Sequence, residues 1–132
     1  MVEESILKEL IKGAIEIRSK AYAPYSGYKV GAAVLSFDGS IFCGCNIENA
    51  SYGLTNCDER TAIFKMVSEG QLKIKAMAII GSGDTPAFPC GACRQVISEF
   101  ADGDTEIYVL YSEDKYEVYK LKDLLPHTFK LD

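Results

Sequence analysis

The segment from Ile74 to Ile80 is apolar at every position except Lys75, and it limits the possible folds most. A short strand with apolar side chains on both faces must be covered on both faces, as in sheets flanked by helices. Helical periodicity supplies such covers at residues 3–21, Cys57–Glu69 and Cys90–Phe100. The sequence therefore predicts a sheet with a helix layer on each side.

Further strands are predicted on both sides of this central segment. Tyr28–Ser36 and Ile41–Ile47 form a pair of strands joined by a tight turn at Asp38-Gly39, and Glu106–Tyr111 and Tyr116–Leu121 follow. Pro24 is expected to stop the first helix, and a short helical turn at Leu121–Leu125 is closed by Pro126. Asn56 is expected to cap the second helix, with Gly70 at its end. No linker or internal repeat interrupts the chain, so residues 1–132 are expected to form one domain.

Composition excludes several classes of function. The chain has 14 Lys plus Arg against 19 Asp plus Glu, and this net charge of −5 argues against binding to a nucleic-acid backbone. The single histidine, His127, excludes a two-histidine zinc motif and has no recognisable triad partners. No apolar run approaches the roughly 20 residues that span a bilayer. The acidic, periodic N-terminus does not resemble a signal peptide, so a cytoplasmic protein without a membrane partner is expected.

Three cysteines have the spacing of a metal site. Cys90 and Cys93 form a C-x-x-C motif, which places both thiols on one face at the first turn of a helix. Amides at a helix N-terminus favour thiolates, and Cys57 opens another helix. Three thiolate ligands would leave the fourth zinc position for water, which is typical of a catalytic site.

The C-x-x-C motif alone is also compatible with two other functions. A structural zinc site would need a fourth ligand, which Cys43 or Cys45 could supply. A thiol redox protein would use Cys90 and Cys93 without metal. Glu59, two residues after Cys57, favours catalysis because a carboxylate beside a ligand can move the proton of a metal-activated water. A solvated surface glutamate is the alternative interpretation of Glu59.

C-x-E-R at Cys57–Arg60 and P-C-G-A-C at Pro89–Cys93 together resemble the zinc deaminase signature. The segments AYAPYSGYKVGAA, GCNIENASYG, CDERTAIFKMVSEG and PCGACRQVISEF resemble the small homotetrameric bacterial-type cytidine deaminases, and the resemblance extends from Ala21 to Phe129. It implies a three-layer α-β-α sandwich with a mixed five-stranded sheet and one Zn²⁺ per chain. It also implies hydrolytic deamination of cytidine and 2′-deoxycytidine in pyrimidine salvage.

The resemblance assigns roles around the metal. It implies Cys57, Cys90 and Cys93 as zinc ligands and Glu59 as the catalytic acid and base. Arg60 would offset the negative charge of three thiolates on one Zn²⁺, although a surface arginine is the plain alternative. Gln95 and Arg94 are weaker candidates for positions close to the sulfurs. Asp58 stands where the family usually has Ala; its backbone N–H would bind the pyrimidine, and its side chain would add negative charge.

Substrate contacts are also implied. Asn46 and Glu48 share a strand face, and the resemblance makes them ribose ligands, whereas their spacing alone suits a polar strand end. Tyr28 matches an aromatic beside the pyrimidine, and Ala50 is a further substrate contact. Tyr52 and Phe129 match residues that reach a neighbouring subunit's active site, and each aromatic has a routine core or surface role as its alternative.

Other interpretations of the sequence stay open. A zinc deaminase acting on a free base, an antibiotic or a polynucleotide would have no use for Asn46 and Glu48, and the acidic charge counts against a polynucleotide. Cys43 and Cys45 are otherwise best explained as small buried hydrophobes. Gly81-Ser82-Gly83 lacks the third glycine of a dinucleotide-binding loop and runs toward Pro86, so that function is rejected.

Overall fold

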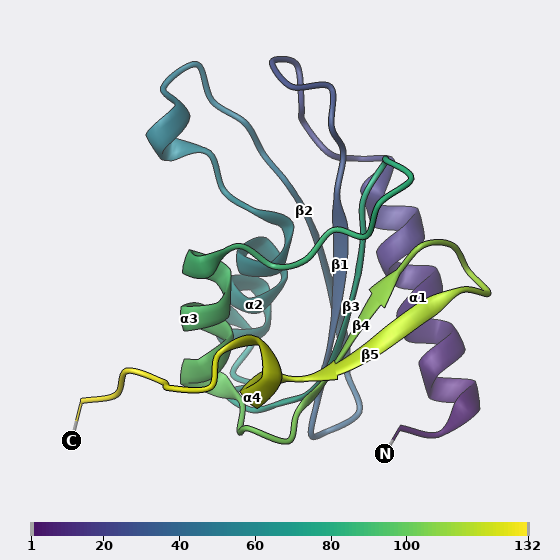
Figure 1. The fold of residues 1–132 in the computed structure, drawn as a ribbon, viewed down its shortest axis with the longest axis vertical. Helices are drawn as coiled ribbons and strands as arrows, with labels where there is room; N and C mark the ends of the chain where they lie inside the picture. Colours follow the sequence, from purple (N-terminus) through teal and green to yellow (C-terminus); the bar gives the residue numbers. More distant parts are fainter. Residues whose placement is uncertain (1, 132) are drawn as a thin grey trace.

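A computed structural model describes residues 2–131, and it contains one mixed five-stranded sheet (Figure 1). The strand order is β2-β1-β3-β4-β5, and only β3 and β4 run parallel. The predicted mixed sheet is thereby confirmed. The strands are β1 (Gly31–Ser36), β2 (Ile41–Cys45), β3 (Ile74–Ile80), β4 (Glu106–Leu110) and β5 (Tyr116–Lys120).

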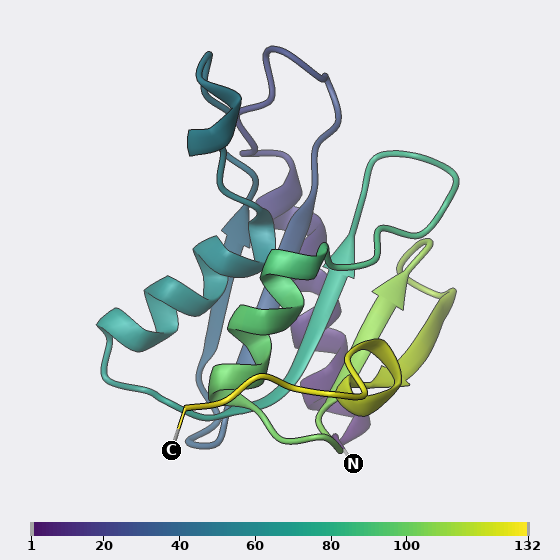
Figure 2. The ribbon, with the colours of Figure 1, turned by 60° about the vertical axis from the view of Figure 1, so that its left-hand side comes forward.

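Helices cover both faces of this sheet, as the apolar central strand requires. Helix α1 (Glu4–Arg18) packs on one face, and α2 (Asp58–Ser68), α3 (Gly91–Phe100) and the short α4 (Leu121–Leu124) lie on the other (Figure 2). Two apolar clusters fill the spaces between these layers. The predicted three-layer α-β-α sandwich is confirmed.

Two glycines allow the helices to approach the sheet closely. A Cβ at Gly31 would lie 2.2 Å from the carbonyl oxygen of Ala14 in α1. A Cβ at Gly44 would lie 2.3 Å from the amide nitrogen of Ala62 in α2. Helix α2 therefore rests on the backbone of β2, which holds the N-terminal end of the helix beside the end of that strand.

Two predicted boundaries are wrong. Helix α1 ends at Arg18, well before Pro24, because Tyr22 leaves the helix and exchanges hydrogen bonds with Asn46 and Glu48. The cap residue of α2 is Cys57 and not Asn56. The backbone of Asn56 is instead paired with Ile47, with N···O distances of 2.9 and 3.0 Å.

Several local features depart less from expectation. The segments 28–30 and 46–47 lie outside the strands that were predicted to contain them, and a 3-10 turn at Tyr52–Leu54 was not predicted. Gly39 and Gly70 adopt φ values of 92° and 90°, which suits their expected places in a turn and after a helix end.

Within residues 2–131, no helix has the length and apolar character that crossing a membrane requires.

Candidate active site at the helix N-termini

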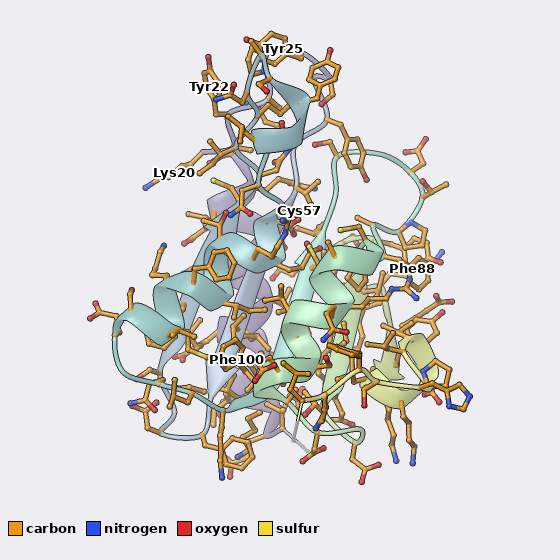
Figure 3. The ribbon with its side chains drawn as sticks, turned by 90° about the vertical axis from the view of Figure 1, so that its left-hand side faces the viewer. Lys20, Tyr22, Tyr25, Cys57, Phe88 and Phe100 are labelled. Atoms are coloured by element: carbon orange, nitrogen blue, oxygen red, sulfur yellow. The ribbon has the colours of Figure 1, made fainter. Side chains whose placement is uncertain are left out.

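The three predicted metal ligands lie together where α2 and α3 begin. Cys57 is the cap residue of α2, Cys90 is the cap residue of α3, and Cys93 lies in the first turn of α3. Figure 3 shows Cys57 at the end of α2 that faces the start of α3. The sulfurs of Cys57 and Cys90 are 3.7 Å apart and those of Cys90 and Cys93 are 3.4 Å apart, and all three lie within 4.8 Å of one another.

This arrangement fits zinc. Zn–S bonds of ~2.3 Å at tetrahedral angles place ligand sulfurs about 3.8 Å apart, close to the observed separations. All three cysteines are free thiols, and α2 and α3 direct their positive N-terminal ends toward them. Within residues 2–131, no further His, Cys, Asp or Glu belongs to this group. Cys43 and Cys45 therefore do not supply the fourth ligand that a closed structural site would need.

Arg60 contacts the cysteine cluster as the sequence suggested. Its Nη2 donates a hydrogen bond to Cys57 Sγ at 3.4 Å, one helical turn along α2. Hydrogen bonding from Cys93 is the largest cause that lowers the pKa of Cys57 to about 5, and the hydrogen bond from Arg60 acts in the same direction. The same contact with Cys57 raises the pKa of Arg60. The site therefore favours a thiolate at Cys57 before any metal binds.

Glu59 is buried beside this cluster and is not one of its members. Its side chain is 3% exposed, although glutamates are rarely buried in proteins. Burial raises the pKa of the Glu59 carboxyl. A carboxyl group that holds its proton more readily than usual can act as both base and acid in one reaction cycle. A solvated surface glutamate, the alternative interpretation of this residue, is excluded.

Asp58 differs from what its sequence position suggested. Its side chain is also 3% exposed, and its Oδ2 has no hydrogen-bond partner. Burial, followed by the adjacent Glu59, raises the pKa of Asp58 to about 10. Burial therefore opposes the extra negative charge that the sequence predicted at this position.

Asn46 and Glu48 lie just beyond the end of β2, and both hold the chain segment around Tyr28. Asn46 is buried; its Oδ1 accepts from the Val30 amide and its Nδ2 donates to the Tyr28 carbonyl, both at 2.9 Å. Glu48 accepts from the Tyr25 and Ser26 amides at 2.9 and 3.1 Å and from the Ser26 hydroxyl. The Ser26 hydroxyl is the main cause of the lowered pKa of Glu48.

A surface pocket lies next to this carboxylate. It is lined by Tyr25, Ser26, Glu48, Tyr52 and Thr55, and the Tyr25 and Tyr52 rings meet edge to face at 6.0 Å between centroids. The lining offers a carboxylate, the hydroxyls of a serine and a threonine, and two tyrosine side chains. Such a lining suits a sugar, whose hydroxyls need hydrogen-bond acceptors and whose ring carbons pack on apolar surface.

The remaining predicted substrate residues are more exposed. Tyr28 is 38% exposed, and Tyr52 and Phe129 are 73% and 66% exposed. Ala50 is exposed as well, in the loop before the 3-10 turn. Gln95 does not hydrogen-bond a cysteine sulfur in the described part of the chain; its Nε2 donates to the Phe129 carbonyl at 3.1 Å. Gln95 therefore anchors the C-terminal segment alongside α3.

Arg94 also contacts backbone and not the cysteine sulfurs. Its Nε donates to the Pro89 carbonyl and its Nη1 to the Leu124 carbonyl, both at 2.8 Å. The guanidinium therefore joins the loop before α3 to α4. Arg94 supports the position of Cys90 through the backbone.

Sequence reasoning missed two residues around Tyr28. The Ser26 hydroxyl accepts from the Tyr28 amide at 3.0 Å, and Ser82 Oγ bonds both backbone groups of Lys29. No motif marked either serine. Ser82 lies in Gly81-Ser82-Gly83, which the sequence analysis considered only as a dinucleotide-binding loop. Its partner, Lys29, is 53 residues away in sequence.

Comparison with known proteins agrees with this geometry. Residues 4–110 match the family model described as the cytidine and deoxycytidylate deaminase zinc-binding region. The chain belongs to the cytidine and deoxycytidylate deaminase family. The match contains all three clustered cysteines and Glu59, and the family is a zinc-binding one. The cysteine cluster could therefore hold one zinc ion.

Individual members of the family are similar over nearly their full length. A cytidine deaminase of Halalkalibacterium halodurans is 50% identical over 120 residues, covering 91% of both chains. A cytidine deaminase of Mycobacterium tuberculosis is 40% identical over 119 residues, covering 90% of this chain and 86% of that protein. The crystal structure of cytidine deaminase from Burkholderia pseudomallei superposes with a TM-score of 0.87 at 44% identity, covering 98% of this chain and 100% of that one.

Proposed function

We propose that this protein catalyses hydrolytic deamination of cytidine and 2′-deoxycytidine, giving uridine or 2′-deoxyuridine and ammonia. The observation that carries the proposal is the buried Glu59 beside three clustered cysteine sulfurs, a group that contains no fourth ligand residue among residues 2–131. Relatives that are 40–50% identical and named cytidine deaminase support the same reaction.

Cys57, Cys90 and Cys93 would hold the ion. Zinc bound by three protein ligands activates water for attack on an electrophilic carbon. Arg60 offsets the negative charge of the thiolates, which otherwise makes the site less able to acidify water. The amides at the starts of α2 and α3 add positive potential in the same place.

Glu59 would carry the protons of the reaction. Hydrolysis adds water at C4 of the pyrimidine and expels the amino group from the same carbon, so protons must leave the water and reach N3 and the departing nitrogen. Glu59 is the buried carboxyl beside the cluster and can accept the proton and deliver it. Its raised pKa, caused by burial, suits a group that alternates between the two forms.

The substrate sugar would lie in the pocket beside Glu48, and the base would lie near Tyr28. Asn46 would hold the segment that carries Tyr28. A site built to pair hydroxyl groups rejects a substrate that lacks them, because its polar groups are left unpaired. Free cytosine should therefore be a very poor substrate. The Glu48 carboxylate should also disfavour cytidine monophosphate, because the added phosphate brings further negative charge.

We place this activity in the cytoplasm and in pyrimidine salvage, with a homotetramer as the active form. The exposed aromatic side chains of Tyr52 and Phe129 support the assembly, because aromatic residues are enriched at interfaces between chains. In that assembly Ala50 and Tyr52 would face a shared site, and Phe129 would close over the substrate of a neighbour.

The test is a substrate panel with metal analysis of the same sample. Ultraviolet absorbance would follow deamination of cytidine, 2′-deoxycytidine, cytosine and cytidine monophosphate. We expect turnover of both nucleosides, little turnover of the other two compounds and about one zinc per chain. Cytosine deaminated as well as cytidine would contradict the sugar assignment, and zinc-loaded protein inactive on all four would contradict the proposed function.

A further inference from the structure

The sheet opens at one end of β1, and the opening lies beside the substrate site. Both backbone ladders of β1 reach Gly31, which is paired with Cys45 on one side and with Ile80 on the other. The preceding residues Tyr28–Val30 belong to no strand, although their backbone continues the line of β1. Strands β2 and β3 end here. The Val30 carbonyl still accepts from the Asn46 backbone amide at 3.3 Å, but the other backbone groups of Tyr28–Val30 need other partners.

Side chains on both sides of the segment hydrogen-bond the backbone of Tyr28–Val30 where the strand pairing has ended. On the β2 side, the Asn46 amide bonds Tyr28 O and Val30 N at 2.9 Å each. On the β3 side, Ser82 Oγ accepts from Lys29 N at 3.0 Å and donates to Lys29 O at 2.5 Å. Alternate residues of an extended segment direct their backbone groups to opposite sides. Asn46 and Ser82 therefore hold Tyr28–Val30 from its two edges.

We propose that Ser82 is a positioning residue for nucleoside binding. Its hydroxyl fixes the Tyr28–Val30 segment against the loop between β3 and α3, which leads to the metal ligands. The proposal rests on the proposed function. Ser82 lies in the loop from β3 to α3, and this loop leads directly to Cys90. Its hydroxyl thus joins the loop before the metal ligands to the segment that presents the Tyr28 ring.

A second contact between the same two segments supports this assignment. A Cβ at Gly81 would lie 2.1 Å from the hydroxyl oxygen of Tyr28 and 2.8 Å from its Cζ. The Tyr28 ring therefore packs against the backbone of the residue immediately before Ser82. Displacing the loop from Lys29 would move the surface on which this ring rests. An enzyme that has lost the Ser82 hydroxyl should then bind its substrate less well without losing its chemical machinery.

The test compares Ser82→Ala with Ser82→Thr and with Ser68→Ala in zinc-loaded enzyme. Ser68 is a matched control, because its hydroxyl also donates to a backbone carbonyl, at 2.8 Å, but at the far end of α2. Loss of a typical net hydrogen bond predicts a rise of about five-fold in KM for cytidine in Ser82→Ala. We expect kcat and zinc content to stay unchanged and Ser82→Thr to restore KM. Ser68→Ala should behave as the wild type does.

Amide hydrogen exchange provides a readout that does not depend on turnover. The Lys29 amide should exchange faster in Ser82→Ala, because its acceptor is gone, and should be protected again in Ser82→Thr. Unchanged KM, unchanged Lys29 exchange, or a KM rise matched by zinc loss would each overturn the proposal. An inactive wild-type protein whose Lys29 amide still responds to Ser82→Ala would instead contradict the proposed function alone.

Discussion

The guanidinium of Arg60 lies 3.4 Å from the sulfur of Cys57, and this contact joins the first turn of α2 to the metal cluster. The Nε of the same side chain is buried without a hydrogen-bond partner. The cation is therefore held at the cluster by its charge and by this sulfur contact. Three thiolates around one Zn²⁺ leave a net negative charge, which Arg60 offsets.

Arg60→Gln should weaken both metal binding and catalysis. Loss of a partner to a metal ligand typically costs 10–100-fold, roughly, in affinity or activity. Arg60→Lys, which keeps the charge but not the planar donor group, should fall between Gln and the wild type. Chelator competition and kcat/KM on cytidine measure the two effects. Equal values in all three proteins would show that Arg60 has no role at the metal.

Asp58 should make folding stability depend on pH. Burial raises the pKa of its carboxyl group to about 10 in the folded protein, against 3.8 for the ordinary group. The folded state therefore binds more protons between these values, and the contribution of Asp58 to the free energy of unfolding falls as pH rises from about 4 toward 10. The physical cost is the burial of a carboxyl group whose Oδ2 has no partner.

Asp58→Asn removes this titration while keeping the size of the side chain. Thermal unfolding of zinc-loaded protein should show a gain over the wild type that grows from pH 5 to pH 9 by up to about 1.4 kcal/mol per pH unit. Comparing the two proteins at each pH cancels contributions from other groups. A gain of the same size at both pH values would refute a buried, protonated Asp58.

Cys90→Ala should lose zinc and activity together. The sulfurs of Cys57 and Cys93 would remain, but two thiolates are fewer ligands than catalytic zinc sites employ. Cys43→Ala is the control, because Cys43 lies outside the clustered group and should keep about one zinc per chain. Metal analysis after dialysis against a weak chelator distinguishes the two. Stoichiometric zinc in Cys90→Ala would mean that the ligand set is different.

Phe129→Ala should lower kcat/KM while leaving zinc content unchanged. Phe129 is 66% exposed, and in the proposed assembly it closes over the substrate of a neighbouring chain, which excludes water. Leu131→Ala is a matched control, since that side chain is 86% exposed two residues further on. Light scattering of the wild type should give the mass of four 14.5 kDa chains, about 58 kDa. A fully active monomer would contradict the shared site.

Periodicity and spacing predicted most of the fold and the metal cluster. The helix and strand order depends on local patterns, and the apolar segment around Met77 required helices on both faces of the sheet. Spacing placed Cys57 and Cys90 each at the start of a helix, and the resemblance to zinc deaminases implied that the two lie together. These predictions needed no knowledge of contacts between distant residues.

The remaining features depend on such contacts. Asn56 has a favourable side chain for capping, but pairing with Ile47 uses its backbone and moves the helix start to Cys57. The burial of Asp58 depends on the close packing of α2 over Gly44. The bonds between Ser82 and the Lys29 backbone form just beyond the ends of the neighbouring strands, which no local pattern encodes.

The most direct test of the account is the turnover of cytidine by Glu59→Gln with zinc measured in the same sample. The substitution keeps the size of the side chain and removes its ability to carry a proton. We predict about one zinc per chain. We also predict that kcat falls by roughly 10²–10⁴-fold or more. Near-normal kcat in zinc-loaded Glu59→Gln would contradict the central claim that the buried Glu59 carries the protons of deamination.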